Sequence, residues 1–85
     1  MPKALPDNDS RGFKFRFFSN ENNEPPHVHV FKGDEKLPTA KWWLVPNLKL
    51  EYNKGFKANE IRLMEQILKE KRSTIINKWN GYFNK

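Results

Sequence analysis

Cysteine is absent from this 85-residue sequence, and long apolar stretches are absent too. Without cysteine the chain cannot form a disulfide, a cysteine-ligated metal site or a thiol nucleophile. No apolar run approaches the roughly 20 residues that a membrane-spanning helix needs. Residues 1–11 also lack the apolar core of a secretory signal peptide. We therefore expect a cytoplasmic protein with no membrane partner.

Hydrophobic residues make up only 36% of the chain, yet 14% of all residues are aromatic. Because disordered chains are poor in aromatic residues, this composition predicts a folded domain with a small core rich in rings. The length fits one domain. We expect a flexible arm over residues 1–12, which are polar and contain two prolines, and a single folded domain over residues 13–85.

The net charge of +6 is confined to the second half of the sequence. Residues 1–40 hold six basic and six acidic side chains, whereas residues 41–85 hold ten basic and four acidic ones. Such an asymmetry indicates a polyanionic or acidic partner. A lysine-rich surface selected for solubility explains it equally well, so both interpretations stay open.

Alternation of apolar and polar residues predicts the strands. Three runs alternate with a period of two, and a shorter fourth run repeats the pattern; they are Phe13–Ser19, His27–Lys32, Leu37–Val45 and Leu48–Tyr52. Segments rich in Asn, Pro and Gly separate the runs, as expected of turns. These features predict an antiparallel sheet of three or four strands.

After Phe56 the apolar spacing changes to three and four residues, which predicts helix. Glu60 stands where a capping glutamate would help the first turn, and Arg72–Thr74 offer a second cap. We therefore expect two helices, or one helix with a kink. Because the sheet and the helical segment each have one apolar face, an α+β fold with the helices packed on one face of the sheet follows. The residues expected on the sheet are Met64, Ile67, Trp79 and Phe83.

Both histidines of the chain, His27 and His29, lie in the segment Glu24–Val30. On a strand they would point the same way, with Cα atoms roughly 6.6 Å apart. They are candidates for an acid–base pair in RNA cleavage, or for two metal ligands completed by Glu24 or Glu21. The third interpretation is structural, with both rings on the solvent face of the sheet. H-x-H alone is a weak metal signal, and we assign no metal or other cofactor.

Aromatic and basic side chains form the candidate binding surfaces. Phe18, Phe31 and Trp43 fall on faces opposite the inferred core positions, with Arg16 and Lys41 among the cations near them. Such rings are candidates to stack nucleic-acid bases, to contact a partner protein or the arm, or to belong to the core of a bent sheet. On the helical half, a row of basic side chains either contacts the phosphates of a nucleic acid or is a solvated face. The row consists of Arg62, Lys69 and Arg72.

Several of these pieces occur together in one known family. The chain resembles small prokaryotic proteins of domain-of-unknown-function family 4160 in six segments: Phe13–Phe18, Ser19–Glu21, Glu24–Val30, Ala40–Leu44, Gly55–Ile61 and Trp79–Phe83. The most specific element is P-P-H-x-H-V. The sequence departs from the family pattern at Lys57, where a capping Ser or Asn is frequent, and in its longer polar arm.

The resemblance implies no established activity. Family members are often encoded beside another small protein, which implies a toxin–antitoxin-like pair and therefore a small cognate partner. The leading hypothesis is a cytoplasmic binding module of a prokaryotic two-gene system, with RNA or DNA as a further ligand. The alternative is a metal-independent ribonuclease toxin that uses His27 and His29 as its acid–base pair, so whether the chain is an enzyme stays open.

Overall fold

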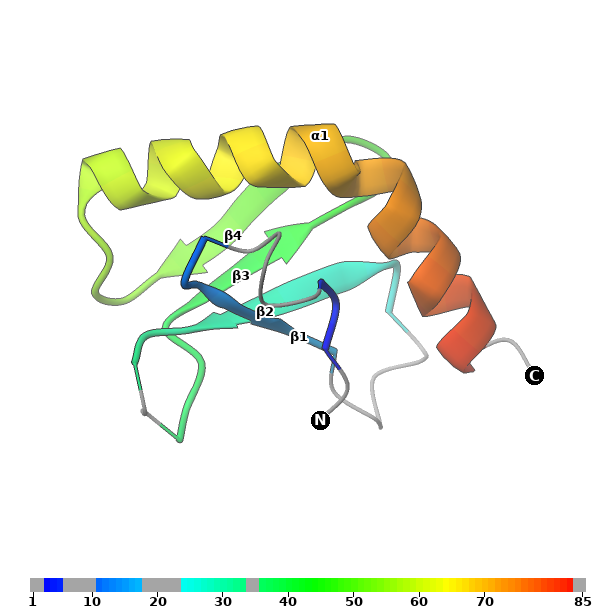
Figure 1. Ribbon diagram of the computed structural model, residues 1–85, viewed down its shortest axis with the longest axis horizontal. Coiled ribbons are helices and arrows are strands. Elements are labelled where there is room, and N and C mark those ends of the chain that lie inside the picture. The colour runs from blue at the N-terminus through cyan, green and yellow to red at the C-terminus, as the bar shows by residue number, and fades with distance from the viewer. Residues whose placement is uncertain (1–2, 6–10, 18–23, 34–35, 84–85) are drawn as a thin grey trace.

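The computed structural model describes residues 3–5, 11–17, 24–33 and 36–83. A four-stranded antiparallel sheet is followed by one long helix (Figure 1). The elements are β1 (Lys14–Arg16), β2 (His27–Phe31), β3 (Ala40–Trp43), β4 (Lys49–Asn53) and α1 (Ala58–Phe83). The strands lie in the sheet in chain order, so neighbours in the sheet are also neighbours in the sequence. The predicted α+β fold is confirmed, and the short fourth strand is present.

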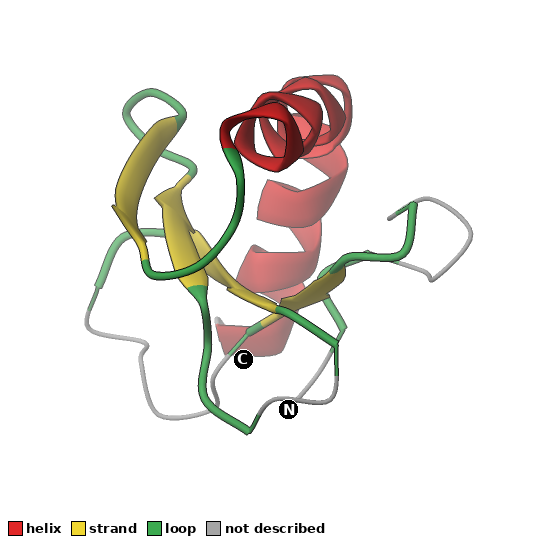
Figure 2. Ribbon diagram, turned by 90° about the vertical axis from the view of Figure 1, so that its left-hand side faces the viewer, coloured by secondary structure: helices red, strands yellow, loops and turns green. Residues whose placement is uncertain are grey.

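The pairing of the strands defines a core face of the sheet. Val28 of β2 lies opposite Trp42 of β3. Val30 lies between Phe15 of β1 and Ala40 of β3. Because alternate residues of a strand point to the same side, these five side chains share one face, and all of them are buried. Figures 1 and 2 show α1 over the sheet, and its buried residues complete the core: Met64, Ile67, Leu68, Ile75 and Trp79.

The helix is continuous, but it turns strongly near its middle, and its second half runs past one end of the sheet (Figure 1). Of the two expected arrangements the kinked helix is therefore correct, and Arg72–Thr74 do not cap a second helix. The first turn is capped as predicted, because the Lys57 backbone N–H donates to Glu60 Oε1 at 2.9 Å. Of the predicted sheet contacts, Met64, Ile67 and Trp79 are buried and Phe83 is partly buried against the core.

Three residues of the expected arm lie against the sheet. The backbone N–H of Ala4 donates to the Phe15 carbonyl at 2.9 Å, and Lys3 forms a β-bridge with Arg16. Ala4 and Leu5 are buried within the core. Residues 3–5 are thus held beside β1 by one bridge and one backbone hydrogen bond, and Leu5 supplies an apolar side chain to the core.

Candidate functional site

The two histidines lie on the second face of β2, opposite the valines, and both are buried. The exposed fraction is 0% for His27 and 4% for His29. Their ring centroids are 5.1 Å apart in an edge-to-face arrangement, as expected for residues two apart on one strand. The solvent exposure expected for a structural pair is wrong, because both rings are buried; Trp43 of β3 and Trp79 of α1 pack against His27.

His27 joins three parts of the fold. Its Nδ1 lies 2.9 Å from the Pro25 carbonyl oxygen, and because a carbonyl can only accept a hydrogen bond, Nδ1 carries the proton. The imidazole also contacts Trp43 of β3 at 5.3 Å and Trp79 of α1 at 5.0 Å between ring centroids. The ring therefore links β2 and the loop before it to β3 and to the second half of the helix.

Trp43 is half-buried, and contacts on several sides fix its indole. The indole Nε1–H donates to Glu51 Oε1 at 2.7 Å, and the Lys41 ammonium lies 4.3 Å from the ring centroid. Lys41 is itself held by Glu24, whose two carboxylate oxygens lie 3.0 and 3.2 Å from Nζ. Together with the contact to His27, these interactions restrict rotation of the indole.

Strand β4 is irregular at the residue that binds this indole. Lys41 pairs with Tyr52, whereas the next pair along the strands is Trp42 with Leu50. Glu51 is therefore an extra residue on β4, and the extra residue of a β-bulge leaves the ladder of paired residues. Its carboxylate is placed where it accepts the indole N–H.

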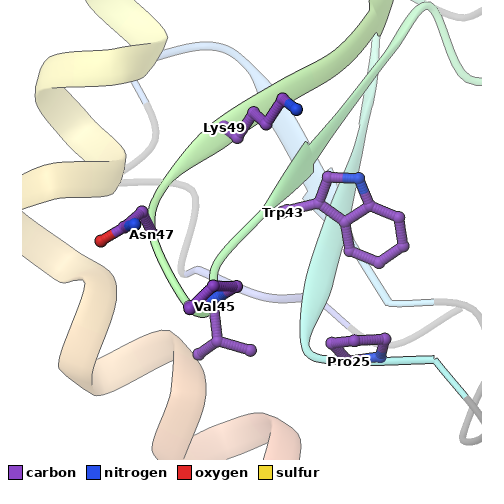
Figure 3. Close-up of a pocket in the computed structure, with 6 residues that line it drawn as sticks. Pro25, Trp43, Val45, Asn47 and Lys49 are labelled. Atoms are coloured by element: carbon purple, nitrogen blue, oxygen red, sulfur yellow. The ribbon is translucent and has the colours of Figure 1, made fainter.

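An open groove of about 480 Å³ lies beside Trp43. Four of its lining residues are apolar and only one is charged; the lining consists of Pro25, Trp43, Val45, Pro46, Asn47 and Lys49. Figure 3 shows Lys49 above the indole and Pro25 below it, with Val45 to the lower left. A concave apolar surface with few polar groups is typical of ligand and peptide sites.

Arg72 holds one wall of this groove. Its Nε donates to the Leu44 carbonyl at 2.6 Å, and Nη2 donates to the Pro46 carbonyl at 3.2 Å. The helix is thereby tied to the loop between β3 and β4, which supplies residues 45–47 of the lining. The sequence carries no signal for this role, because the two carbonyls lie 28 and 26 residues from Arg72.

The predicted basic row on α1 is divided between different roles. Arg62 and Lys69 are exposed, and Lys69 lies 3.7 Å from Glu65 in an (i, i+4) pair. The guanidinium of Arg72 instead donates hydrogen bonds to the loop between β3 and β4. A phosphate contact by Arg72 would compete with these hydrogen bonds. The row is therefore not a set of three equivalent exposed cations.

The sheet residues among the candidates are only partly brought together. His29 of β2 pairs with Arg16 of β1 on one side and with Lys41 of β3 on the other. Phe31 is 5% exposed and therefore buried, although it does not belong to the core cluster that contains Val28 and Val30. Phe18 lies outside the described residues. Among the described residues of this set, Trp43 is the one whose ring is partly exposed.

Sequence reasoning missed most of the groove. Among the lining residues only Trp43 was a candidate, whereas Val45, Asn47 and Lys49 were not. Two signals were available: Pro46 ends the strand beside an exposed ring, and the alternation of Leu48–Tyr52 places Lys49 on the polar face of β4.

The metal interpretation has no third ligand in the described part of the chain. No group of three or more His, Asp or Glu side chains suited to a metal ion occurs within the described ranges. The carboxylate of Glu24, one proposed third ligand, forms an ion pair with the Lys41 ammonium. Glu21, the other one, lies outside the described residues.

The fold and the site define a small α+β domain with an aromatic groove beside a buried histidine pair. The chain belongs to the family described as a domain of unknown function (DUF4160), whose model matches residues 12–80. The family membership expected from the resemblance is thus confirmed. Comparison with curated proteins and comparison with solved structures each found no match. Across the described ranges, α1 is too polar to be a membrane span.

Proposed function

We propose that this protein is a small binding module that holds a segment of a cognate partner protein in the groove beside Trp43. The observation that carries the proposal is the state of the indole, which is fixed by polar contacts yet borders an open apolar groove. A side chain ordered before binding loses little conformational freedom when a partner docks, which favours affinity. Tryptophan is also strongly enriched among the residues that dominate binding energy at interfaces.

The proposed setting is the cytoplasm of a prokaryote and a two-gene, toxin–antitoxin-like system, in which the product of the neighbouring gene is the partner. The family resemblance supports this setting. The excess of basic residues in positions 41–85 supports an acidic partner, since five of the six residues that line the groove lie in that half of the chain. Exposed cations such as Arg62 support RNA or DNA as a further ligand.

Co-expression with the product of the neighbouring gene tests the proposal. Tagged wild-type protein should retain that product, Trp43→Ala should lose it, and Trp43→Phe should retain part of it. Leu37→Ala is the matched control, because Leu37 is 77% exposed and precedes the opposite end of β3. Failure of the wild type to retain the product, or equal retention by Trp43→Ala, would contradict the proposal.

The ribonuclease alternative has one favourable observation, the 5.1 Å separation of the imidazole centroids. Burial opposes it, because an acid–base pair must reach the 2′-hydroxyl and the leaving oxygen of RNA. The Nδ1 of His27 is moreover engaged by the Pro25 carbonyl. Expression of the wild type and of His27→Ala/His29→Ala, with growth and total RNA followed, tests this alternative. We expect no cleavage by either; cleavage by the wild type alone would establish it.

A further inference from the structure

We infer that the partner segment in the groove is extended, that it places an apolar side chain against Trp43, and that a neighbouring carboxylate on it pairs with Lys49. This inference rests on the proposed function and specifies the chemistry of its ligand. Three features of the groove lead to it: its charge, its size and the apolar residues that line it.

The charges around the groove favour an acidic ligand. Lys49 is the one charged residue in the lining. The nearby carboxylates are directed elsewhere, Glu24 to the Lys41 ammonium and Glu51 to the indole N–H. Within the described part of the chain, the exposed Lys49 ammonium makes no hydrogen bond or ion pair. The Lys49 ammonium is therefore the group that can form an ion pair with a charged ligand in the groove.

The size of the groove favours a short segment over a folded surface. About 480 Å³ lies within the range of roughly 300–1,000 Å³ that is typical of pockets for small ligands. Two globular surfaces in a stable complex instead bury about 800 Å² on each partner. A few side chains of one segment fill a groove of this size.

The residues that line the groove favour an extended backbone in the ligand. Pro25 and Pro46 both line the groove, and Figure 3 shows Pro25 beside the indole of Trp43. The Arg72 hydrogen bonds hold the loop that carries Pro46. Proline-containing segments dock in an extended conformation on apolar grooves that present aromatic rings, and they lose little entropy on binding; Trp43 is the ring that this groove presents. The expected segment therefore has proline, leucine or an aromatic residue at one position and Asp or Glu one or two positions away in its sequence.

Selection from a phage-displayed library of random peptides tests the inference without knowledge of the partner. Immobilised wild-type protein is the bait, and peptides that also bind Trp43→Ala are removed. We expect the remaining peptides to be enriched in Asp or Glu next to an apolar residue. With Lys49→Glu as the bait, the preference should change to Lys or Arg. The matched control Lys78→Glu, an exposed site on α1, should select the same acidic peptides as the wild type.

A selected acidic peptide, labelled for fluorescence polarisation, supplies the magnitudes. Trp43→Ala should weaken its binding at least about tenfold, and Lys49→Glu should weaken it by about three- to tenfold, the effect expected when an exposed ion pair is replaced by repulsion. Circular dichroism of each variant shows that it is folded. If Trp43→Ala does not fold, Trp43→Phe takes its place.

The possible failures are distinguishable. If no peptide depends on Trp43, both the proposed function and this inference are overturned. Trp43-dependent peptides that lack an acidic preference, or whose preference survives Lys49→Glu, overturn the inference alone. Two further results would also overturn it: a wild-type dimer that Trp43→Ala dissociates in sedimentation, which places a second copy in the groove, and oligouridylate binding lost in Trp43→Ala, which places a base there.

Discussion

The helix, the sheet and the histidine pair meet at Trp79, so the substitution Trp79→Ala tests the packing of the whole domain. The side chain is 5% exposed. Its ring centroid lies 5.4 Å from that of Phe17, 5.0 Å from that of His27 and 4.1 Å from that of Phe83. Removal of the indole would remove the ring contacts that join the second half of α1 to Phe17 and His27.

The expected loss of stability follows from the area buried. A buried tryptophan removes roughly 200 Å² from water, which contributes about 5 kcal/mol at about 25 cal/mol per Å². Unfolded chains already bury part of that area, which lowers the value by roughly 10–40%, while the cavity left behind raises it. We expect Trp79→Ala to lower the free energy of unfolding by about 3–5 kcal/mol. For a domain of this size the melting temperature then falls by roughly 12 °C or more.

Urea denaturation followed by circular dichroism measures this loss. Leu37→Ala is the control, because a side chain that is 77% exposed should change the free energy of unfolding by less than about 0.5 kcal/mol. A loss below about 1 kcal/mol in Trp79→Ala would refute the packing of α1 against the end of the sheet, since no burial of this extent has so small an effect.

Three further predictions use the same denaturation assay. His27→Ala should lower the free energy of unfolding by about 2–4 kcal/mol, because it removes three ring contacts and a hydrogen bond to the loop before β2; a nearly unchanged value would favour a functional role for the imidazole. Arg72→Ala should cost about 1–3 kcal/mol, because two loop carbonyls lose their donor, and full recovery by Arg72→Lys would contradict the two-point contact, which an ammonium does not reproduce. Glu24→Gln should cost less than about 1 kcal/mol, since the ion pair with Lys41 is partly exposed; a cost that persists undiminished in 1 M salt would argue against an ionic contribution.

The regular elements were predictable because short stretches of sequence encode them. The alternation in His27–Lys32 reports a strand whichever neighbours it pairs with, and the spacing of apolar residues after Phe56 reports a helix. The cap at Glu60 is likewise a local feature. The fold class then follows, because a sheet and a helix with one apolar face each can bury those faces only against one another.

The site was less predictable because it depends on contacts between distant segments. The meeting of Glu51 with the indole of Trp43 depends on an extra residue in β4, and no residue of that strand signals the change of register. The burial of His27 depends on the direction of α1 after its bend, because that direction places Trp79 against the imidazole. The expected acid–base pair was correctly placed on one strand face, but the cover that hides it comes from Trp79, more than fifty residues later in the chain.

The central claim is that Trp43 anchors a partner in the groove that it borders. Isothermal titration calorimetry of the neighbouring gene product into wild-type protein and into folded Trp43→Ala measures the two dissociation constants. We predict that the alanine variant binds at least about tenfold more weakly, a difference of about 1.4 kcal/mol. Equal dissociation constants would contradict the claim.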